Sequence, residues 1–370
     1  MEYIVIFFSI YFGLYILFLL FNIISLLFFS SKVVNQNISI PISVIVAIRN
    51  GEKSLNNLIQ DLLKQEYAGK LEIILVDDMS SDKTKAIIKS YEKKSSKIKY
   101  VCSSEGDSEL SFKKRALDAG IKNASNEHLL FTDVDCRFGK LWVNAMASPF
   151  VNDIDYVIGF SRAKYIYGFA NLFQKIDFLI LMFSAKAVTD IHYPLASSGQ
   201  NQGFTKSIFK KVGGYKKISN LLMGDDSIFL QLCLKERANV VFCSDPESYV
   251  FCRSESNWKD LLMQRMRWAG DGNIMWKYNF IFYQIMVATV ISNLFVLILS
   301  FNCDWNSLII ILSIKFIIEL FLFILGRINF KVNLSFINFI FWFIINIPYV
   351  CLMCIASFFV PLISWKKRKQ

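Results

Sequence analysis

The sequence predicts an α/β domain flanked by membrane-spanning helices, and three observations support this fold class. Hydrophobic residues make up 54% of the 370-residue chain, compared with roughly 45–50% in soluble domains, and they concentrate at the two ends. In the middle, short β-rich runs alternate with amphipathic segments, which indicates a parallel, doubly wound sheet. Acidic residues follow two of the β-rich runs, at the sheet edge where open α/β domains bind ligands.

The N-terminal segment, residues 1–30, is predicted to be a transmembrane anchor. Residues 3–29 include no charged side chain, and roughly 20 apolar residues suffice to cross a bilayer. A cleaved signal peptide would begin with basic residues and end at small ones. This segment begins Met-Glu and ends Phe-Phe-Ser-Ser, so we expect an anchor that is not removed.

Residues 279–365 are predicted to form further transmembrane segments. Residues 279–303 and 332–365 are uncharged, and residues 305–326 are apolar except for Lys315 and Glu319. These two side chains lie four positions apart, so a helix places them on one face. They form either an ion pair that neutralises itself inside the bundle, which we favour, or the polar lining of a substrate path.

The net charge of +11 has two explanations. Nucleic-acid binding is one, and the gathering of basic residues on the cytoplasmic side of a membrane protein is the other. Residues 366–369, Lys-Lys-Arg-Lys, directly follow the last apolar run, as expected of a basic cytosolic tail, 366–370, beside anionic lipid. We therefore expect a membrane partner and no nucleic acid.

Residues 31–278 are predicted to form one soluble α/β domain that begins with a polar linker. Continuous apolar, β-branched runs predict buried strands, and apolar residues at helical spacing predict amphipathic helices. The predicted strands are residues 42–48, 71–76 and 128–132, and the predicted helices are residues 54–67, 81–94, 111–122 and 227–235.

Two acidic clusters follow predicted strands. Asp77 and Asp78 end the second strand, and Asp133 and Asp135 follow the third. Acidic residues are common in turns, but two such clusters in one sheet indicate a site. In an extended Asp-x-Asp segment both carboxylates point the same way, and two carboxylates suit Mg²⁺ or Mn²⁺, since hard cations prefer oxygen ligands. The cation could bridge the phosphates of a nucleotide sugar.

These residues resemble glycosyltransferase family 2. Residues 43–50, Ser-Val-Ile-Val-Ala-Ile-Arg-Asn, and 76–82, Val-Asp-Asp-Met-Ser-Ser-Asp, are similar to the opening of that family. Residues 132–135, Thr-Asp-Val-Asp, resemble its metal-binding Asp-x-Asp. Residues 224–226, Gly-Asp-Asp, resemble its acidic pair, and residues 264–268, Gln-Arg-Met-Arg-Trp, match the Gln-x-x-Arg-Trp motif of its membrane-bound members. The resemblance implies the GT-A type fold, a Rossmann-like mixed sheet that binds a nucleotide sugar.

The resemblance also implies a role for each matching residue, position by position. Asp226 is expected to be the catalytic base, with Asp225 and Arg267 also catalytic. Asp133 and Asp135 are expected at the metal. The expected donor-binding residues are Ala47, Arg49, Asp77, Asp78, Lys113 and Asp133, and the residues expected near the diphosphate and the acceptor are Gln264, Arg267 and Trp268.

Simpler interpretations exist for several of these positions. Asp225 and Asp226 could cap the helix that begins at Ser227. Arg265 and Trp276 are expected to anchor the chain at the membrane interface, as basic and aromatic residues do. Lys114 is expected on a solvated helix face.

Two positions depart from the family pattern. The acidic pair is Asp-Asp where Glu-Asp is common, and Asp118 stands where Asn is usual. Neither change removes a group that the chemistry needs, so both bear on the donor and the acceptor and leave the reaction class unchanged.

The implied activity is inverting transfer of a sugar from a nucleotide diphosphate sugar to the hydroxyl of a lipid or glycan acceptor, in synthesis of cell-envelope glycolipid or polysaccharide. A polyprenyl-phosphate glycosyltransferase with the same fold is one alternative, and it would need the base less. A catalytically silent membrane scaffold or export partner is another. The expected location is a bacterial inner membrane, with the catalytic domain in the cytosol.

The expected topology leaves one conflict at the C-terminus. With residues 31–278 in the cytosol, residues 279–303 cross outward and residues 305–326 return, which places Arg327 and Lys331 inside as the positive-inside rule requires. A single crossing by residues 332–365 would leave the basic tail outside, and two crossings need roughly 20 residues each. Because Pro348 can break a helix, we expect a re-entrant or broken segment.

This topology makes a testable prediction. A C-terminal reporter that is active only outside the cytosol should give no signal, because the broken segment returns the tail to the cytosol. A reporter placed after residue 303 is the matched positive control. A strong C-terminal signal would instead mean that residues 332–365 cross once.

Overall fold

The computed structural model describes residues 2–29, 38–164 and 167–359. Most of the predicted linker and the whole basic tail, 366–370, lie outside the described residues. The chain divides into two compact units. An α/β unit comprises Ser31–Lys164 and His192–Arg253, and a helical unit comprises Met1–Ser30, Tyr165–Ile191 and Ser254–Gln370.

The α/β unit is built on a seven-stranded mixed sheet with the order β3-β2-β1-β4-β8-β6-β9. The first four strands are parallel, and β8 runs antiparallel to its neighbours β4 and β6. The three predicted strands are confirmed as β1, β2 and β4. The strands are β1 Ile42–Ile48, β2 Leu71–Asp77, β3 Ile98–Cys102, β4 His128–Thr132, β6 Tyr156–Gly159, β8 Asn201–Thr205 and β9 Val240–Cys243.

Alternate residues of the buried strands pack against opposite layers of helices, as strand geometry requires. Val44 and Val46 of β1 belong to a core that includes Leu58 of α2 (Glu52–Leu63) and Trp142 of α5 (Trp142–Ala147). Ile45, between the two valines, faces α4 (Phe112–Asn123), where a Cβ on Gly120 would lie 2.5 Å from the Ile45 side chain. The apolar run of β1 is therefore buried on both faces, which is why it lacks the alternation of a half-exposed strand.

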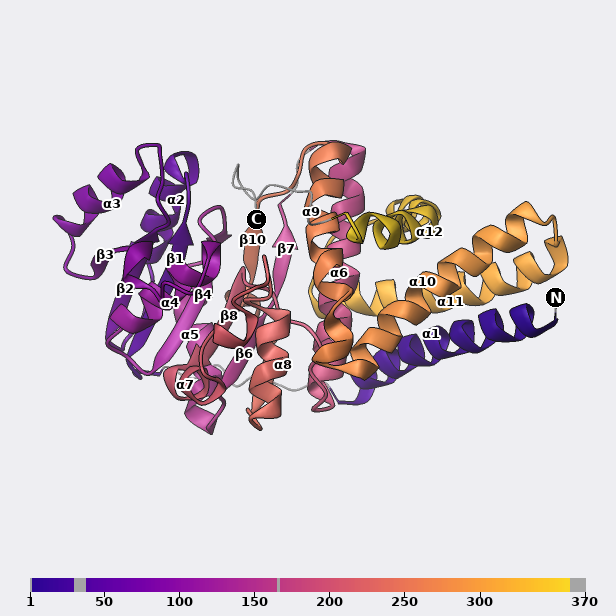
Figure 1. Ribbon diagram of the computed structural model, residues 1–370, viewed down its shortest axis with the longest axis horizontal. Helices are drawn as coiled ribbons and strands as arrows, with labels where there is room; N and C mark the ends of the chain where they lie inside the picture. The colour runs from indigo at the N-terminus through magenta and orange to yellow at the C-terminus, as the bar shows by residue number, and fades with distance from the viewer. Residues whose placement is uncertain (1, 30–37, 165–166, 360–370) are drawn as a thin grey trace. The chain divides into compact units, whose positions relative to one another are not determined.

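Further helices and a small sheet complete the α/β unit (Figure 1). Predicted helix 81–94 is shorter in the structure, since it begins at Thr84. The Asp82 carboxylate accepts the backbone N–H groups of Glu52 and Thr84, so Asp82 lies in a loop bonded to the start of α2 and is not part of the helix. The remaining elements are α3 Thr84–Glu92, α7 Lys206–Val212, α8 Ser227–Lys235 and a three-stranded sheet of β5 Arg137–Phe138, β10 Val250–Cys252 and β7 Ser161–Ala163.

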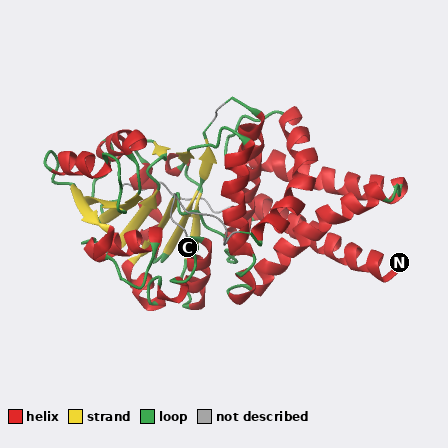
Figure 2. Cartoon of the chain, turned by 45° about the horizontal axis from the view of Figure 1, so that its top comes forward, coloured by secondary structure: helices red, strands yellow, loops and turns green. Residues whose placement is uncertain are grey.

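Four helices of the helical unit are long and apolar enough to cross a membrane, among the residues described. In α1, α10 and α11, which lie side by side (Figure 1), many large apolar side chains are exposed, for example Phe21 at 51% and Ile317 at 64%, as lipid-facing residues are. Figure 2 shows the helical character of this unit. The α-helices of this unit that the structure describes are α1 Glu2–Phe28, α6 Phe169–Asp190, α9 Trp258–Gly272, α10 Phe280–Phe301, α11 Trp305–Asn329 and α12 Phe336–Ser357.

The last membrane segment corrects one expectation. Helix α12 continues without interruption through Pro348, so the expected break at this proline is wrong. Neighbouring helices in a membrane protein can satisfy the backbone groups that an internal proline leaves free. A continuous α12 is long enough for one full crossing. In the reporter experiment, a single crossing corresponds to a strong C-terminal signal.

Lys315 and Glu319 form an ion pair inside the bundle, as the favoured interpretation held. Both side chains are almost fully buried in α11, and the Tyr15 hydroxyl of α1 donates a hydrogen bond to Glu319. Because burying a lone charge in this environment is costly, the pair and the tyrosine together make α11 compatible with the membrane.

Asn201, at the start of β8, gives a stability prediction for the α/β unit. It is fully buried, accepts from Trp142 Nε1 at 3.0 Å and donates to the carbonyl oxygens of Phe160 and Ser248 at 2.9 and 2.8 Å. Asn201→Ala leaves these partners unsatisfied, so we expect a loss of roughly 2–4 kcal/mol of unfolding free energy, seen as a lower Tm in detergent. Exposed Asn239→Ala is the control and should change stability by less than about 0.5 kcal/mol. Equal melting of the two variants would contradict the prediction.

Candidate active site

The candidate site lies at one edge of the mixed sheet. Strands β1, β2 and β4 are parallel, so their carboxyl ends share this edge. In the antiparallel pair of β4 and β8, Thr132 lies opposite Asn201, so β8 begins where β4 ends. The loop before β8 is therefore brought to the same edge as the residues that follow β1, β2 and β4.

The predicted nucleotide-binding residues are held together by backbone contacts. Arg49 Nη1 donates to the carbonyl oxygens of Asp78 and Met79 at 2.8 and 3.2 Å. The Asp77 carboxylate accepts the Ser80 N–H at 3.1 Å, and Asp77 and Asp78 are both buried. Ala47, half-buried, lies opposite Val76 in the register of β1 and β2. The four predicted positions 47, 49, 77 and 78 thus lie together at the ends of β1 and β2.

Lys113 lies at the centre of the second predicted group. It stands in the first turn of α4, and its Nζ is 3.1 Å from a carboxylate oxygen of Asp133 and 3.1 Å from one of Asp225. Burial lowers the pKa of Lys113, but the nearby negative charges outweigh burial and raise it, Asp133 first and then Asp225 and Asp226. The ammonium group therefore stays charged and joins α4, the end of β4 and the loop before α8.

Asp225 and Asp226 are adjacent in the chain, but the pKa values of their carboxyl groups shift in opposite directions. Burial opposes ionisation of Asp225, but the Lys113 ammonium outweighs burial and lowers the pKa of this carboxyl. Burial and then the negative charge of Asp225 raise the pKa of Asp226 to about 6. Asp226 also caps α8, since its carboxylate accepts the Ser227 N–H and the Gly199 N–H. The capping interpretation is thus confirmed for Asp226, whereas the Asp225 carboxylate pairs with Lys113.

Gly199 is a site residue that the sequence analysis missed. A Cβ at this position would lie 3.1 Å from Lys113 Nζ and 3.4 Å from an Asp225 carboxylate oxygen. The loop before β8 therefore approaches the charged cluster so closely that a side chain at position 199 would crowd Lys113 and Asp225. No motif marks this glycine, because the closeness arises from the antiparallel pairing of β4 and β8.

Lys114 corrects another expectation. It was expected on a solvated face, but it is buried, and its Nζ donates to the carbonyl oxygens of Leu221 and Met223, the latter at 3.0 Å. A buried ammonium needs such acceptors. Lys114 thereby ties α4 to the segment that leads into Asp225 and Asp226.

The Asp-x-Asp segment is a turn. The Cys136 N–H donates to the Asp133 carbonyl at 3.1 Å, so the expected extended conformation of this segment is wrong. Among the described residues no group of three side chains is placed to hold a metal ion. Asp133, with 29% of its side chain exposed, and Asp135 still offer carboxylate oxygens, and Mg²⁺ is commonly held by one or two carboxylates together with substrate phosphates and water. The residues present fit a cation of that kind.

The Gln-x-x-Arg-Trp motif lies on α9 in the helical unit. Gln264 donates to Glu255 at 3.3 Å, and Arg267 donates to the Met263 carbonyl of its own helix at 3.2 Å. Arg265 was expected to be an interfacial anchor, but it is buried and lies 2.8 Å from the Asp177 carboxylate. Trp276 is exposed, at 52%.

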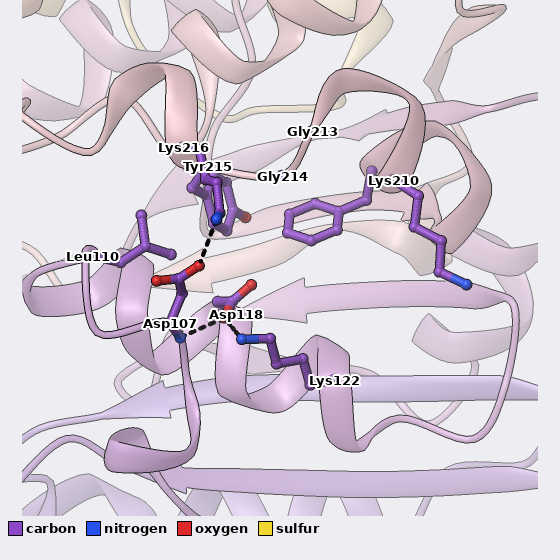
Figure 3. Close-up of a pocket in the computed structure, with 10 residues that line it drawn as sticks. Asp107, Leu110, Asp118, Lys122, Lys210, Gly213, Gly214, Tyr215 and Lys216 are labelled. Carbon is purple, nitrogen blue, oxygen red and sulfur yellow. Dashed lines mark hydrogen bonds and ion pairs between the residues drawn. The ribbon is translucent and has the colours of Figure 1, made fainter.

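A cavity of about 240 Å³ lies elsewhere on the α/β unit, between α4 and the segment after α7 (Figure 3). None of the predicted site residues lines it. Asp118, the departure from the family's asparagine, is at its wall, where the carboxylate accepts the Asp107 N–H at 2.8 Å and pairs with Lys122 at 2.8 Å. Asp118 therefore orders the loop before α4. Both of these partners, Asp107 and Lys122, lie outside the cluster of Lys113, Asp133, Asp225 and Asp226.

Comparison with known proteins places this geometry in a family. The family model described as Glycosyl transferase family 2 matches residues 43–213, and the model described as Glycosyl transferase family group 2 matches residues 140–362. "Probable glycosyltransferase YdaM" of Bacillus subtilis (strain 168) is 22% identical over 286 residues, which are 76% of this chain and 66% of that protein. This chain thus spans slightly less than two thirds of that relative.

A solved structure shares the fold along the whole chain. The mannosyltransferase PcManGT from Pyrobaculum calidifontis, in complex with GDP-Man and Mn²⁺, has a TM-score of 0.62 at 15% identity, and the match covers 99% of each chain. At this identity the likeness shows the fold alone, and the fold is the mixed GT-A type sheet with long apolar helices. The family matches, which together span most of the residues from strand β1 to helix α12, show that the chain is a member of glycosyltransferase family 2.

Proposed function

We propose that this glycosyltransferase moves a sugar from a nucleotide diphosphate sugar to an acceptor hydroxyl with inversion, and that Asp226 is the base. The observation that carries the proposal is the divergence of two adjacent carboxyl groups: the pKa of Asp225 is lowered and that of Asp226 is raised to about 6. Paired acids whose environments separate their pKa values are typical of acid–base sites. At neutral pH Asp226 is ionised, yet basic enough to accept a proton.

In this mechanism the acceptor oxygen attacks the anomeric carbon as Asp226 takes the hydroxyl proton. The bond from that carbon to the diphosphate breaks on the opposite face, which inverts the configuration. A positioned base contributes roughly 10²–10⁴ in rate. Lys113 keeps a positive charge beside Asp133 and Asp225, where it can attract the donor's phosphates.

The donor is proposed to bind along the carboxyl edge of the sheet. The nucleoside would lie at Ala47, Arg49, Asp77 and Asp78, which the structure brings together, and the diphosphate at Lys113 and Asp133. Gln264, Arg267 and Trp268 of α9 are proposed to contact the diphosphate and the acceptor, on the strength of the family motif. Arg267 suits this role because its planar guanidinium can bind two phosphate oxygens at once.

Asp133 and Asp135 are proposed to hold Mg²⁺ or Mn²⁺. The cation would neutralise the charge that develops on the leaving diphosphate. The similar mannosyltransferase was solved with GDP-Man and Mn²⁺, so that donor and that ion are the first to test here.

The acceptor is proposed to be a lipid or a glycan presented at the membrane, with the catalytic unit on the cytosolic side, in cell-envelope polysaccharide or glycolipid synthesis. The four apolar helices support a membrane-borne acceptor, because they keep the enzyme where lipid-linked substrates diffuse.

A donor screen tests the proposal. Detergent-solubilised protein is incubated with a membrane lipid extract and each nucleotide sugar in turn, and release of nucleoside diphosphate and labelled product is measured. One donor should give product, and NMR of the product's anomeric centre should show inversion. Retained configuration would overturn the mechanism. Product formed only with polyprenyl phosphate would identify the alternative reaction, and no turnover with any donor would favour the scaffold.

Removing divalent metal should abolish transfer. EDTA should stop turnover, and Mg²⁺ or Mn²⁺ in excess should restore it, because the carboxylates at positions 133 and 135 offer only oxygen ligands. Asp135→Asn should raise the metal concentration needed for half activity. Full activity in EDTA would exclude the metal role.

Asp226→Asn should bind donor but lose at least about 99% of kcat, since the amide keeps the shape and cannot accept the proton. Asp245→Asn is the matched control, since Asp245 also caps a short helix through its carboxylate and lies outside the proposed machinery. A wild-type rate for Asp226→Asn would move the base elsewhere or favour the polyprenyl phosphate reaction.

The pH profile gives a second check on the same residue. Because the base must be ionised, and because burial and Asp225 raise the pKa of Asp226 to about 6, kcat/KM should be level above roughly pH 7 and fall about tenfold per unit below pH 6. A profile that stays level down to pH 4.5 would contradict the assignment.

A further inference from the structure

One face of helix α6 meets α9 with two polar residues and one aromatic residue. Gln174, Asp177 and Phe178 lie three and four residues apart, so they share a face. All three are buried, although α6 is not one of the four helices long and apolar enough to cross a membrane. Each of them contacts a residue of the Gln-x-x-Arg-Trp segment on α9, within the same helical unit.

Gln174 holds Gln264 in a closed set of hydrogen bonds. Gln174 Nε2 donates to Gln264 Oε1 at 3.2 Å, Gln264 Nε2 donates to Glu255 Oε1 at 3.3 Å, and the Glu255 N–H donates to Gln174 Oε1 at 2.9 Å. Both ends of the Gln264 amide are therefore fixed. Its rotamer depends on a residue 90 positions earlier in the chain.

Asp177 holds Trp268 through Arg265. The Asp177 carboxylate lies 2.8 Å from Arg265 Nη2. The Arg265 guanidinium lies 4.1 Å from the centre of the Trp268 ring, and Phe178 lies 5.8 Å from the same ring, centroid to centroid. A cation over an indole face is a favourable contact. The indole therefore lies against a guanidinium that pairs with the Asp177 carboxylate of α6.

The ionic character of this contact is informative. Removing two charges from water costs several kcal/mol per ion, and a well-packed hydrophobic pair of similar volume is often as stable. An ion pair between α6 and α9 is therefore a poor device for stability alone. Its geometric effect is specific, because it places a carboxylate 2.8 Å from the guanidinium against which the Trp268 ring lies.

We propose that the Gln174–Asp177 face of α6 is a positioning element for transfer: Asp177 orients Trp268 through Arg265, and Gln174 orients Gln264. The inference rests on the proposed role of the α9 motif at the diphosphate and the acceptor. Asp177 and Gln174 are positioning residues, since they touch motif side chains and not the reacting atoms. Displacing a positioned group by about 1 Å can cost up to about a hundredfold in rate.

The test is Asp177→Asn in the full-length protein. We expect kcat to fall by at least about tenfold, while the Kd of the nucleoside diphosphate, measured by calorimetry, stays within about twofold. The Trp268 fluorescence, taken as the difference from Trp268→Phe in each background, should become more accessible to acrylamide. Asp177→Glu should recover part of both signals.

Asp190→Asn is the matched control. Asp190 pairs with Lys186 on the same helix, and that pair is also buried, but it lies roughly 20 Å further along the helix axis. Asp190→Asn should lower Tm to a similar extent and leave kcat within about twofold. Equal loss of kcat in the two variants, or unchanged kcat and Trp268 fluorescence in Asp177→Asn, would overturn the proposal.

Two further measurements keep the result interpretable. In a double-mutant cycle of Asp177→Asn and Arg265→Gln, the effects on kcat should be clearly non-additive, because Asp177 acts through Arg265. Additive effects would overturn the proposal that Asp177 orients Trp268 through Arg265.

If Asp177→Asn does not fold, Gln174→Leu tests the contact with Gln264, with an expected fall in kcat and unchanged Kd. Absence of transfer by the wild-type chain would count against the proposed function, while the Trp268 fluorescence would still test the α6 contact.

Discussion

The Lys113 ammonium between Asp133 and Asp225 is the contact on which the candidate site depends. Three carboxylates, Asp133, Asp225 and Asp226, come together at one edge of the sheet, and like charges in a partly buried site repel strongly. Lys113 offsets that repulsion and in doing so joins a helix, the end of a strand and a loop. It also divides the acidic pair, since the carboxyl group that it contacts is stabilised as an anion and the neighbouring carboxyl group is left more basic.

The sheet explains why this cluster can form. Its parallel half places the residues after β1, β2 and β4 at one edge, and the antiparallel strand β8 begins at that edge. A Cβ at Gly199 would lie only 3.1 Å from Lys113 Nζ and 3.4 Å from an Asp225 carboxylate oxygen. The Gly199 N–H donates to the Asp226 carboxylate, which joins this loop to the start of α8. Lys114 of α4 holds the segment before α8 through a hydrogen bond to the Met223 carbonyl oxygen. In the proposed mechanism, the parallel strands of the mixed sheet would serve donor binding, and the loops that its antiparallel strand brings in would serve proton transfer.

The helical unit uses buried charge in two different ways. Within α11, Lys315 and Glu319 neutralise each other on a single helix, with Tyr15 as a further partner, which makes an apolar span tolerable. Between α6 and α9, Asp177 and Arg265 form an ion pair across two helices, and the Trp268 ring lies against the Arg265 guanidinium. Only the second arrangement links charge to the placement of motif residues, which is why it carries a functional inference and the first does not.

The sequence by itself determined the membrane segments, the three parallel strands β1, β2 and β4, helix α8 and the identity of the acidic clusters. These are local properties, because burial on both faces, helical spacing and acidic residues after strands are read over a few neighbouring positions. It misjudged Lys114 and Arg265, since a charged residue beside a motif looks solvated until a distant carbonyl or carboxylate covers it. It also expected an extended Asp-x-Asp segment and a break at Pro348, where the structure has a turn closed by the Cys136 N–H and a continuous helix. Only the tertiary structure decided the contacts of Gly199, Gln174 and Asp177, because each depends on an element far away in the chain: the antiparallel pairing of β8 for the glycine, and the packing of α6 against α9 for the other two.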